Sequence, residues 1–281
     1  MKKLIPVIFL FVLIFSGCTH YYYVPNVQNV PLFTEKNQTR LSGLVGYASQ
    51  EIGSLGDQQT TCVDFQAAYS LTNHIGVMMN YMWAKESHQT DESTVNNYGR
   101  GSVIEGAAGY YEPFGLNGIV EIYGGFGVSN QHHQYTNTVY DEISQADITQ
   151  VFGTSDLSFV KLFIQPSVGF KLNSSNVTIL KPFDIAFSTR FYSINYGKIT
   201  YTNAEIASIE NFAALSDGNH YFIEPALTIR GGWETVKLQF QLGYAASLNN
   251  SGSDFYEKCH ISLGLFFALG SKEKKLNQET K

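Results

Sequence analysis

Acidic and basic side chains recur at alternate positions of segments that are otherwise apolar. The acids are Asp64, Glu105, Glu121, Asp184 and Glu224, and the bases are Lys161, Arg190, Arg230 and Lys237. Charges enclosed in a narrow space are costly unless they pair and hydrogen bond. We therefore expect an ion-pair network made by Asp64, Glu121, Lys161, Asp184, Arg190, Glu224, Arg230 and Lys237. A gated narrow pore, or a buried carboxylate acting as general acid or base, would use the same residues.

A second group of chemically competent side chains falls between the apolar segments. It consists of His132, His133, Asp141, Glu142, Asp147 and His220. No spacing among them pairs a nucleophile with a base, and adjacent histidines on a strand point to opposite faces. The sequence also lacks the Cys and His spacing of a structural zinc site. We therefore predict no catalytic, metal or cofactor site, and no enzymatic activity.

The N-terminus reads MKKLIPVIFLFVLIFSGC and has the layout of a secretory signal. Its apolar run, residues 4–15, is shorter than the roughly 18 residues that a membrane-spanning helix needs. The small residues before Cys18 resemble the lipobox of bacterial lipoproteins, although Phe15 stands where leucine is usual. We expect Cys18 to be lipidated, with palmitate among its acyl chains, each buried methylene contributing about 0.8 kcal/mol. The alternative is a cysteine beside an ordinary cleavage site.

The residues after Cys18 indicate which membrane, and which side of it, would hold the acyl chains. Thr19 and His20 follow it, without the aspartate that resembles an inner-membrane retention signal. Acidic residues that would resemble a surface-export signal are missing there too. We therefore expect the acyl anchor on the periplasmic side of an outer membrane.

Apolar and polar residues alternate over many short runs, which is typical of strands with one apolar and one wet face. In the run VDFQAAYSLTNHIGVMMNYMW, residues 63–83, the alternation continues on both sides of a three-residue turn. With weaker runs near residues 39–51 and 103–111, the sequence predicts ten strands. Charged residues make up 15% of the chain, against about 25% in soluble domains, so little charge is available to face water.

The connections between the predicted strands alternate in length. Four are tight, near residues 72–74, 112–117, 172–177 and 231–234, and three are long and polar, at residues 85–102, 134–156 and 195–219. Outer-membrane barrels have short periplasmic turns and long outside loops. We therefore predict an all-β fold, an antiparallel up-and-down transmembrane β-barrel of ten strands. Its apolar side chains would face lipid and its ionic side chains would face the lumen.

Several loose motifs run through most of the chain. They are the SGC end of the signal, the following stretch THYYYVPNVQNVPLFTEKNQTR, the segments EGAAGYYEPFG and YGGFGVSN, and the closing run ISLGLFFALG. Together they resemble small outer-membrane β-barrel lipoproteins of Bacteroidetes-type bacteria. The resemblance implies a barrel embedded in the outer membrane with no assigned activity.

The expected organisation is a signal peptide at residues 1–17, a periplasmic tether at residues 18–38, a barrel at residues 39–270 and a periplasmic tail at residues 271–281. The formal charge of -6 is spread without a basic stripe, which argues against nucleic-acid binding. The expected partners are outer-membrane lipid and an extracellular partner bound through the three long loops. We expect a monomer with a structural, adhesion or small-solute role.

Two other hypotheses remain open from the sequence. A periplasmic β-barrel or sandwich, tethered by Cys18, would turn its apolar phase inward and bind a small apolar ligand. A hydrolase would place loop acids and histidines at the outer rim, as the family of ten-stranded outer-membrane proteases does. Cys62 and Cys259 are expected to stay unbonded, because they fall on opposite side-chain phases and one strand would separate them.

Overall fold

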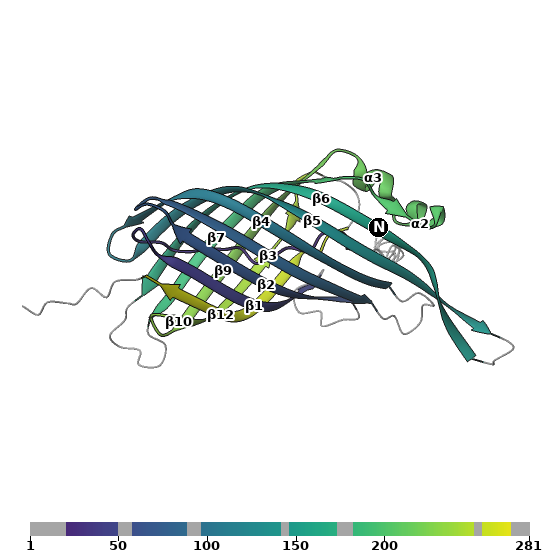
Figure 1. Cartoon of the computed structure of the whole chain (residues 1–281), viewed down its shortest axis with the longest axis horizontal. Helices are drawn as coiled ribbons and strands as arrows, with labels where there is room; N and C mark the ends of the chain where they lie inside the picture. Colours follow the sequence, from purple (N-terminus) through teal and green to yellow (C-terminus); the bar gives the residue numbers. More distant parts are fainter. Residues whose placement is uncertain are drawn as a thin grey trace, which may run out of the picture.

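Ten long antiparallel strands form one closed barrel within residues 21–49, 58–88, 97–141, 146–172, 182–249 and 255–270, which the computed structural model describes. The strands are β1 (Thr39–Ser49), β2 (Gln58–Ser70), β3 (Ile75–His88), β4 (Asn97–Phe114), β5 (Gly118–Asp141), β6 (Ala146–Leu172), β7 (Phe183–Tyr196), β9 (Asn219–Gly232), β10 (Val236–Tyr244) and β12 (Cys259–Leu269). Each pairs with the next, and β12 closes the ring by pairing with β1 (Figure 1). The predicted ten-stranded barrel is confirmed.

The two ends of the barrel differ in their connections. At one end, tight turns join β2 to β3, β4 to β5 and β9 to β10. In the first of these turns the Thr72 hydroxyl accepts the backbone N–H groups of His74 and Ile75, at 3.1 and 2.9 Å. In the second, Gly115 takes a φ of 57°, which favours glycine. We call this end the short-turn end.

The opposite end, which we call the loop end, carries the smaller elements. They are β8 (Thr200–Tyr201), α2 (Ala204–Ile209), α3 (Phe212–Ser216) and β11 (Ala246–Ser247). Figure 1 shows the two short helices over this end of the barrel. None of the described helices is long and apolar enough to cross a membrane.

Strands β5 and β6 continue well past the barrel at the loop end. Their ladder runs to the pair Asp141 and Ala146, with a β-bulge between Tyr135 and Thr136. The segment 134–156, expected to be a long polar loop, is therefore mostly a hairpin. Alternation marks a strand only where its two faces meet different surroundings. Beyond the membrane both faces meet water, so the pattern fades while the backbone ladder continues.

The barrel exposes its apolar side chains and buries its charged ones. Phe65, Phe126 and Leu162 are 56%, 60% and 59% exposed, whereas the charged side chains of the alternate phase are buried. A water-soluble barrel would have the reverse arrangement, so the alternative of a soluble barrel with an apolar interior is wrong. An exposed apolar surface suits contact with hydrocarbon. Closure of the ring also pairs the backbone groups that the two edge strands of an open sheet would expose.

The lumen is occupied by the chain that precedes β1. Residues 21–33 are buried throughout, and we call them the threaded segment. Residues 18–38 were expected to form a periplasmic tether, and for the described part of that range the expectation is wrong. Apolar and polar residues do not alternate in this segment, because it is not a strand. Its amide side chains can hydrogen bond to the polar wall.

The threaded segment runs from the loop end to the short-turn end. Near its start the Tyr22 N–H donates to the Phe255 carbonyl at 2.8 Å, and beyond its end the Asn37 N–H donates to the Ser70 carbonyl at 2.9 Å. It kinks at Leu32, which has a φ of 52°. A side chain on Gly169 would collide with Leu32, so glycine at that position of β6 leaves room for the kink.

Cys62 and Cys259 are both free and buried. Strand β1 separates their strands, as expected, because it pairs with both β2 and β12. The expected opposite phases are not observed. Cys259 is the first residue of β12, where strict alternation has not begun and His260 is buried as well.

Candidate functional site

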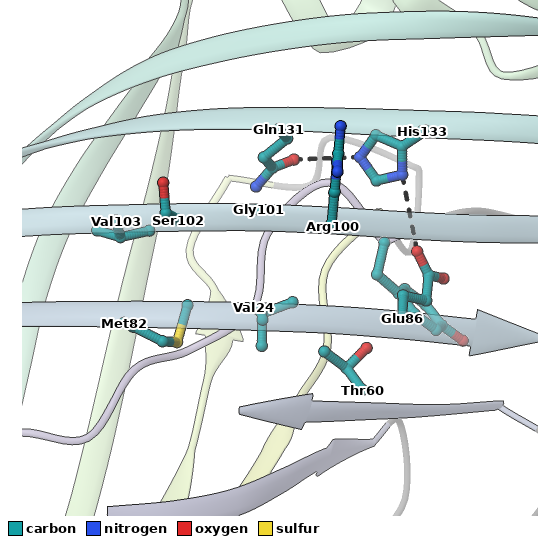
Figure 2. Close-up of a pocket in the computed structure, with 12 residues that line it drawn as sticks. Val24, Thr60, Met82, Glu86, Arg100, Gly101, Ser102, Val103, Gln131 and His133 are labelled. Carbon is teal, nitrogen blue, oxygen red and sulfur yellow. Dashed lines mark hydrogen bonds and ion pairs between the residues drawn. The ribbon is translucent and has the colours of Figure 1, made fainter. Parts of the chain in front are cut away.

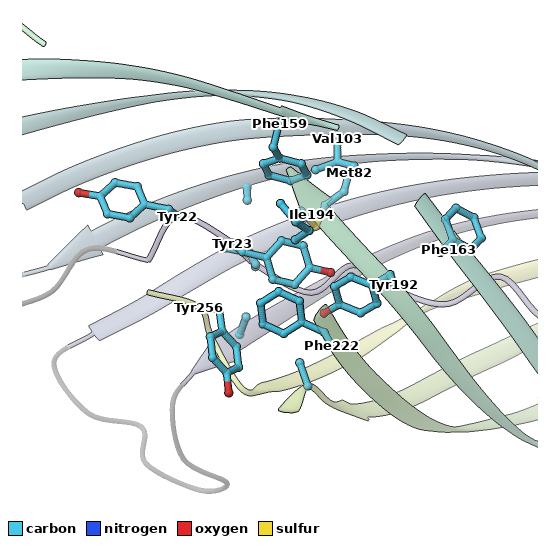
Figure 3. Packing of buried hydrophobic residues seen from close by; sticks show 14 of the residues in the cluster. Tyr22, Tyr23, Met82, Val103, Phe159, Phe163, Tyr192, Ile194, Phe222 and Tyr256 are labelled. Carbon is cyan, nitrogen blue, oxygen red and sulfur yellow. The ribbon is translucent and has the colours of Figure 1, made fainter. Parts of the chain in front are cut away.

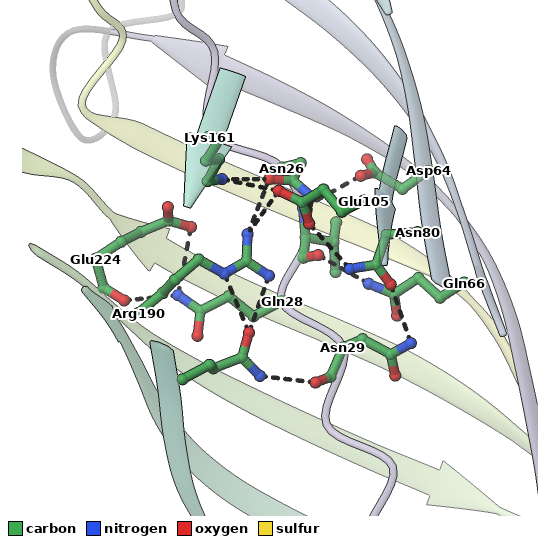
Figure 4. A network of polar contacts seen from close by, with 12 residues as sticks. Asn26, Gln28, Asn29, Asp64, Gln66, Asn80, Glu105, Lys161, Arg190 and Glu224 are labelled. Atoms are coloured by element: carbon green, nitrogen blue, oxygen red, sulfur yellow. Dashed lines mark hydrogen bonds and ion pairs between the residues drawn. The ribbon is translucent and has the colours of Figure 1, made fainter. Parts of the chain in front are cut away.

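Asn26 of the threaded segment lies at the centre of a buried polar cluster (Figure 4). Its Oδ1 accepts from Lys161 Nζ at 3.1 Å and from Arg190 Nη1 at 2.9 Å, and its Nδ2 donates to Glu105 Oε2 at 2.9 Å. Lys161 and Arg190 also lie 2.9 and 3.5 Å from Glu105 Oε1. Asn80 completes the carboxylate's partners with an amide donor at 3.0 Å. One amide thus meets one anion and two cations at once.

Wall side chains supply hydrogen-bond partners to the backbone of the threaded segment. The Val27 N–H donates to Asp64 Oδ1 at 3.2 Å, and its carbonyl accepts from Gln66 Nε2 at 2.8 Å. Gln241 bonds both backbone groups of Gln28, at 2.7 and 2.8 Å. A buried backbone group without a hydrogen-bond partner is costly. Here the wall side chains supply the partners that a neighbouring strand would supply in a sheet.

The same arrangement continues toward the short-turn end. Gln165 Nε2 donates to the Asn29 carbonyl at 2.8 Å, and Arg40 Nε donates to the Pro31 carbonyl at 3.2 Å. The Phe33 N–H donates to Glu121 Oε1 at 3.2 Å. The partners come from strands around the ring, namely β1, β2, β5, β6 and β10. The segment is therefore held from several sides.

Four of the eight residues expected in the ion-pair network pair with a Lys, Arg, Asp or Glu side chain in the described chain, and Asp64 Oδ2 lies 4.0 Å from His260 Nε2. Lys161 and Arg190 meet Glu105, which the expected set did not include. Asp184 Oδ2 lies 2.6 Å from Lys237 Nζ near the short-turn end. The sequence places Glu105 among the inward acids but leaves it out of the expected network, and it gives no sign of the part played by the Asn26 amide.

The other four residues make polar contacts of a different kind. Asp64 and Glu121 accept backbone N–H groups of the threaded segment, and Glu224 Oε1 accepts from Gln28 Nε2 at 3.3 Å. Arg230 Nε donates to Gln239 Oε1 at 2.7 Å, and its guanidinium lies 3.9 Å from the centre of the Phe266 ring. Most of this polar lining therefore serves the threaded segment rather than a chain of ion pairs.

Aromatic rings pack around the start of the threaded segment (Figure 3). The Tyr23 ring lies 5.4 Å from Tyr192 and 5.6 Å from Phe222, and the Tyr256 ring lies 5.0 Å from Phe222. The Glu257 N–H donates to the Tyr23 carbonyl at 3.0 Å. The sequence predicts a tether for these tyrosines, because aromatic residues outside an alternating run do not indicate which way their side chains point.

A small cavity remains beside the threaded segment at the loop end (Figure 2). Its volume is about 20 Å³, and Val24, Glu86 and His133 are among its lining residues. That volume is roughly what one water molecule requires. His133 Nδ1 lies 3.7 Å from Glu86 Oε2, and its Nε2 lies 3.4 Å from Gln131 Oε1. The cavity leaves no room for a larger solute.

Glu257 is a buried acid at the same end of the barrel. Its Oε1 accepts from the Thr60 hydroxyl at 2.5 Å. Burial raises the pKa of the Glu257 carboxyl to about 8, and the nearby Glu86 adds to the rise, whereas the Thr60 hydrogen bond opposes it. A carboxyl whose pKa is raised by burial therefore adjoins the backbone contact that holds Tyr23.

The loop histidines are separated from one another. His132 Nδ1 lies 2.7 Å from Asp156 Oδ1 on the exposed surface, while His133 is buried. His220 contacts the Leu215 carbonyl at 2.8 Å. Among the described residues no group of three or more His, Cys, Asp and Glu side chains could hold a metal ion. Glu142, the side chains of Asp141 and Asp147, and Cys18 lie outside what the structure describes.

A closed barrel with an apolar outer belt and an enclosed polar interior is an outer-membrane β-barrel. No family model matches the chain, and no curated protein is significantly similar to it. Similar solved structures include the outer membrane protease OmpT from Escherichia coli, at 10% identity over 86% of this chain and 96% of that one, with a TM-score of 0.42. The translocator domain of autotransporter NalP from Neisseria meningitidis is 9% identical over 84% and 89%, with a TM-score of 0.44. LpxR from Salmonella typhimurium is 9% identical over 81% and 99%, with a TM-score of 0.40.

These similarities correct one expectation. The sequence-based prediction that the protein is not an enzyme is contradicted, since barrels with this architecture include a protease. At such low identity the likeness concerns the fold alone and assigns no activity to this chain.

Proposed function

We propose that the protein is a lipid-anchored outer-membrane barrel, closed to solutes by its own N-terminal segment, that presents its loop end as a structural or adhesive surface. The observation that carries this proposal is the threaded segment. Its backbone is bonded by Gln66 from β2, Gln165 from β6 and Gln241 from β10. A segment that is hydrogen bonded to several strands around the ring lies across the lumen and fills it.

The filled lumen argues against the small-solute role among the sequence-based hypotheses. Most of the charged residues that could have lined a narrow pore contact the threaded segment, and the cavity beside it has a volume of about 20 Å³. Opening a path would require breaking many buried hydrogen bonds, each worth about 1 kcal/mol net and more where a charge is involved.

The loop end supplies the surface of the proposed role. Strands β5 and β6 extend beyond the barrel, and α2 and α3 lie over the same end. The Phe212 ring of α3 packs 5.6 Å from Tyr22, so α3 is docked on the start of the threaded segment. Segments 85–102, 134–156 and 195–219 would meet an extracellular partner, and lipidation of Cys18 would add a second hold on the membrane.

Planar-bilayer recording tests the closed lumen. We expect the intact, purified protein to give no current steps above baseline. A variant in which residues 24–33 are replaced by an equally long Gly and Ser stretch should conduct, because the wall loses its bonded partner. Steady conductance by the intact protein would refute the closed lumen. If the replaced chain fails to fold, Asn26→Gly combined with Val27→Gly provides a milder loosening, for which we expect intermittent current.

A separate comparison distinguishes the structural role from the adhesive one. Cells that lack the protein are complemented with the full chain or with a chain whose hairpin is shortened by replacing residues 137–150 with a tight turn. A structural role predicts that both chains restore resistance of the envelope to detergent. An adhesive role predicts that only the full chain restores attachment of the cells to a surface.

A further inference from the structure

The direction of the threaded segment decides where the chain before it emerges. Tyr22 is fixed at the loop end, where its hydroxyl contacts Tyr135 at 2.9 Å and Glu210 Oε2 at 2.8 Å. At the short-turn end the Lys36 N–H donates to Asn73 Oδ1 at 3.1 Å, just before β1 begins. The chain therefore enters the barrel through the loop end and leaves it at the short-turn end.

The start of the segment is firmly placed. Tyr22 and Tyr23 are both 1% exposed, and Tyr23 makes the only bridge outside named strands among the described residues, with Tyr256. The Tyr196 hydroxyl donates to the Tyr22 carbonyl at 3.0 Å. Relocating this part to the other end would require withdrawing buried aromatic rings through the filled lumen.

The distance from Cys18 to this fixed point is short. Only Thr19 and His20 lie between Cys18 and Tyr21, and a fully extended chain covers at most about 11 Å from one Cα to the other. The apolar belt of an outer-membrane barrel is about 25 Å tall. A chain that starts from the loop end therefore cannot bring Cys18 back to the short-turn end.

We propose that the segment before Tyr21 emerges on the loop side, and that the acyl chains of Cys18 enter the membrane leaflet that faces the loops. With the short turns in the periplasm, this is the outer leaflet of the outer membrane. The inference rests on the proposed function for the lipidation itself, but the emergence of the chain at the loop end stands independently. It replaces the sequence-based expectation of a periplasmic anchor.

The first test uses the full chain with an epitope inserted between His20 and Tyr21. The matched control carries the same epitope directly after Gly270, at the short-turn end, where Thr39 and Leu269 pair. On intact cells we expect antibody to label the first protein and to label the control only after permeabilisation. If the first epitope is also hidden until permeabilisation, the proposed direction is wrong.

A smaller change guards against misfolding of the tagged chain. His20→Arg creates a trypsin site before the threaded segment, while Lys272, Lys274 and Lys275 are native sites after the barrel. Trypsin added to intact cells should cut after position 20 and spare the C-terminal lysines, as read by mass spectrometry. Cutting at the C-terminal lysines alone would refute the inference.

Lipidation is tested separately, so that its failure can be distinguished from that of the direction. Cells are fed an alkyne analogue of palmitate, and the wild-type chain is compared with Cys18→Ala. We expect the label on the wild type and its loss in the variant. An unlabelled wild type would refute the acyl anchor, and the accessibility results would still decide on which side the chain emerges.

Discussion

Asn26 and Glu105 are joined by a hydrogen bond of 2.9 Å between the Asn26 amide and a carboxylate oxygen in the middle of the barrel. Because Lys161 and Arg190 donate to the other end of the same amide, Asn26 is placed between opposite charges. A side chain with both a donor and an acceptor is required at this point, and neither an acid nor a base could replace it without leaving one partner unsatisfied.

Replacing this amide tests the cluster directly. Asn26→Leu keeps a similar volume but removes one donor and one acceptor next to three charged groups. We expect the free energy of unfolding to fall by about 2–4 kcal/mol, since hydrogen bonds to buried charges are worth about 1.5–3 kcal/mol each. The measurement is urea unfolding in detergent micelles or lipid vesicles, read from the gel mobility of unheated samples.

Lys36→Ala is the matched control, because the Lys36 side chain is exposed and only its backbone N–H makes the contact with Asn73. It should leave the unfolding midpoint within experimental error. Equal losses in both variants would mean that the central cluster has no special contribution.

The pair of Asp184 and Lys237 offers a second test, near the short-turn end. Removing one partner with Asp184→Leu leaves a buried ammonium without its carboxylate at 2.6 Å, for which we expect a loss of about 3–5 kcal/mol. Replacing both, with Asp184→Leu and Lys237→Met, should recover most of that loss because no unpaired charge remains. A double variant that falls as far below the wild type as Asp184→Leu does would show that the pair contributes net stability.

Glu257 predicts a dependence of stability on pH. Burial raises its folded-state pKa to about 8 from an ordinary value of 4.5. The neutral carboxyl therefore favours the folded state fully below about pH 4.5, and this contribution is lost as the pH rises through about 8. We expect the temperature at which the gel mobility changes to fall as the pH rises from about 5 to about 8, and to level off above that.

Glu257→Gln should flatten the dependence of the transition temperature on pH in this range, because it removes the titrating group while keeping a side chain of the same size. Glu112→Gln is the control, since Glu112 is 43% exposed and pairs with His74 at the short-turn end. If the curve of Glu257→Gln coincides with that of the wild type, the titration of Glu257 does not govern stability.

The outer face of β5 tests contact with lipid. Phe126 is 60% exposed within the apolar belt, and Asn130 lies four residues nearer the loop end on the same face. Phe126→Arg should cost about 2–4 kcal/mol in lipid bilayers, whereas Asn130→Arg should cost at most about 1 kcal/mol, because the penalty falls toward the interface. A similar cost at both positions would contradict the assigned depth of the belt.

The sequence predicts the wall of this barrel better than its contents. Two-residue alternation locates the strands because Phe65 and its neighbours meet a different medium from Asp64 and its neighbours. For the outer part of the β5–β6 hairpin the sequence predicts a loop, because the contrast between the two faces ends where both meet water.

The threaded segment was not foreseen for a related reason. Its partners are Gln66, Gln165, Gln241 and other wall residues far away in the chain, and neither composition nor period links them to Asn26 or Gln28. One feature of the sequence did point to it. The inward positions of the strands carry amide side chains, such as Gln66, Gln165 and Gln241, that an ion-pair network does not need. Amides supply both a donor and an acceptor, which is what an unpaired backbone needs.

Residues 21–33 lead into β1, the first strand of the ring. Strand β1 pairs with β2 along one edge and with β12, the last strand, along the other. The ring that this β1–β12 seam closes surrounds residues of the same chain that supplies its first strand. The wall and its filling are therefore one covalent unit, and the short stretch between residue 33 and β1 ties them together.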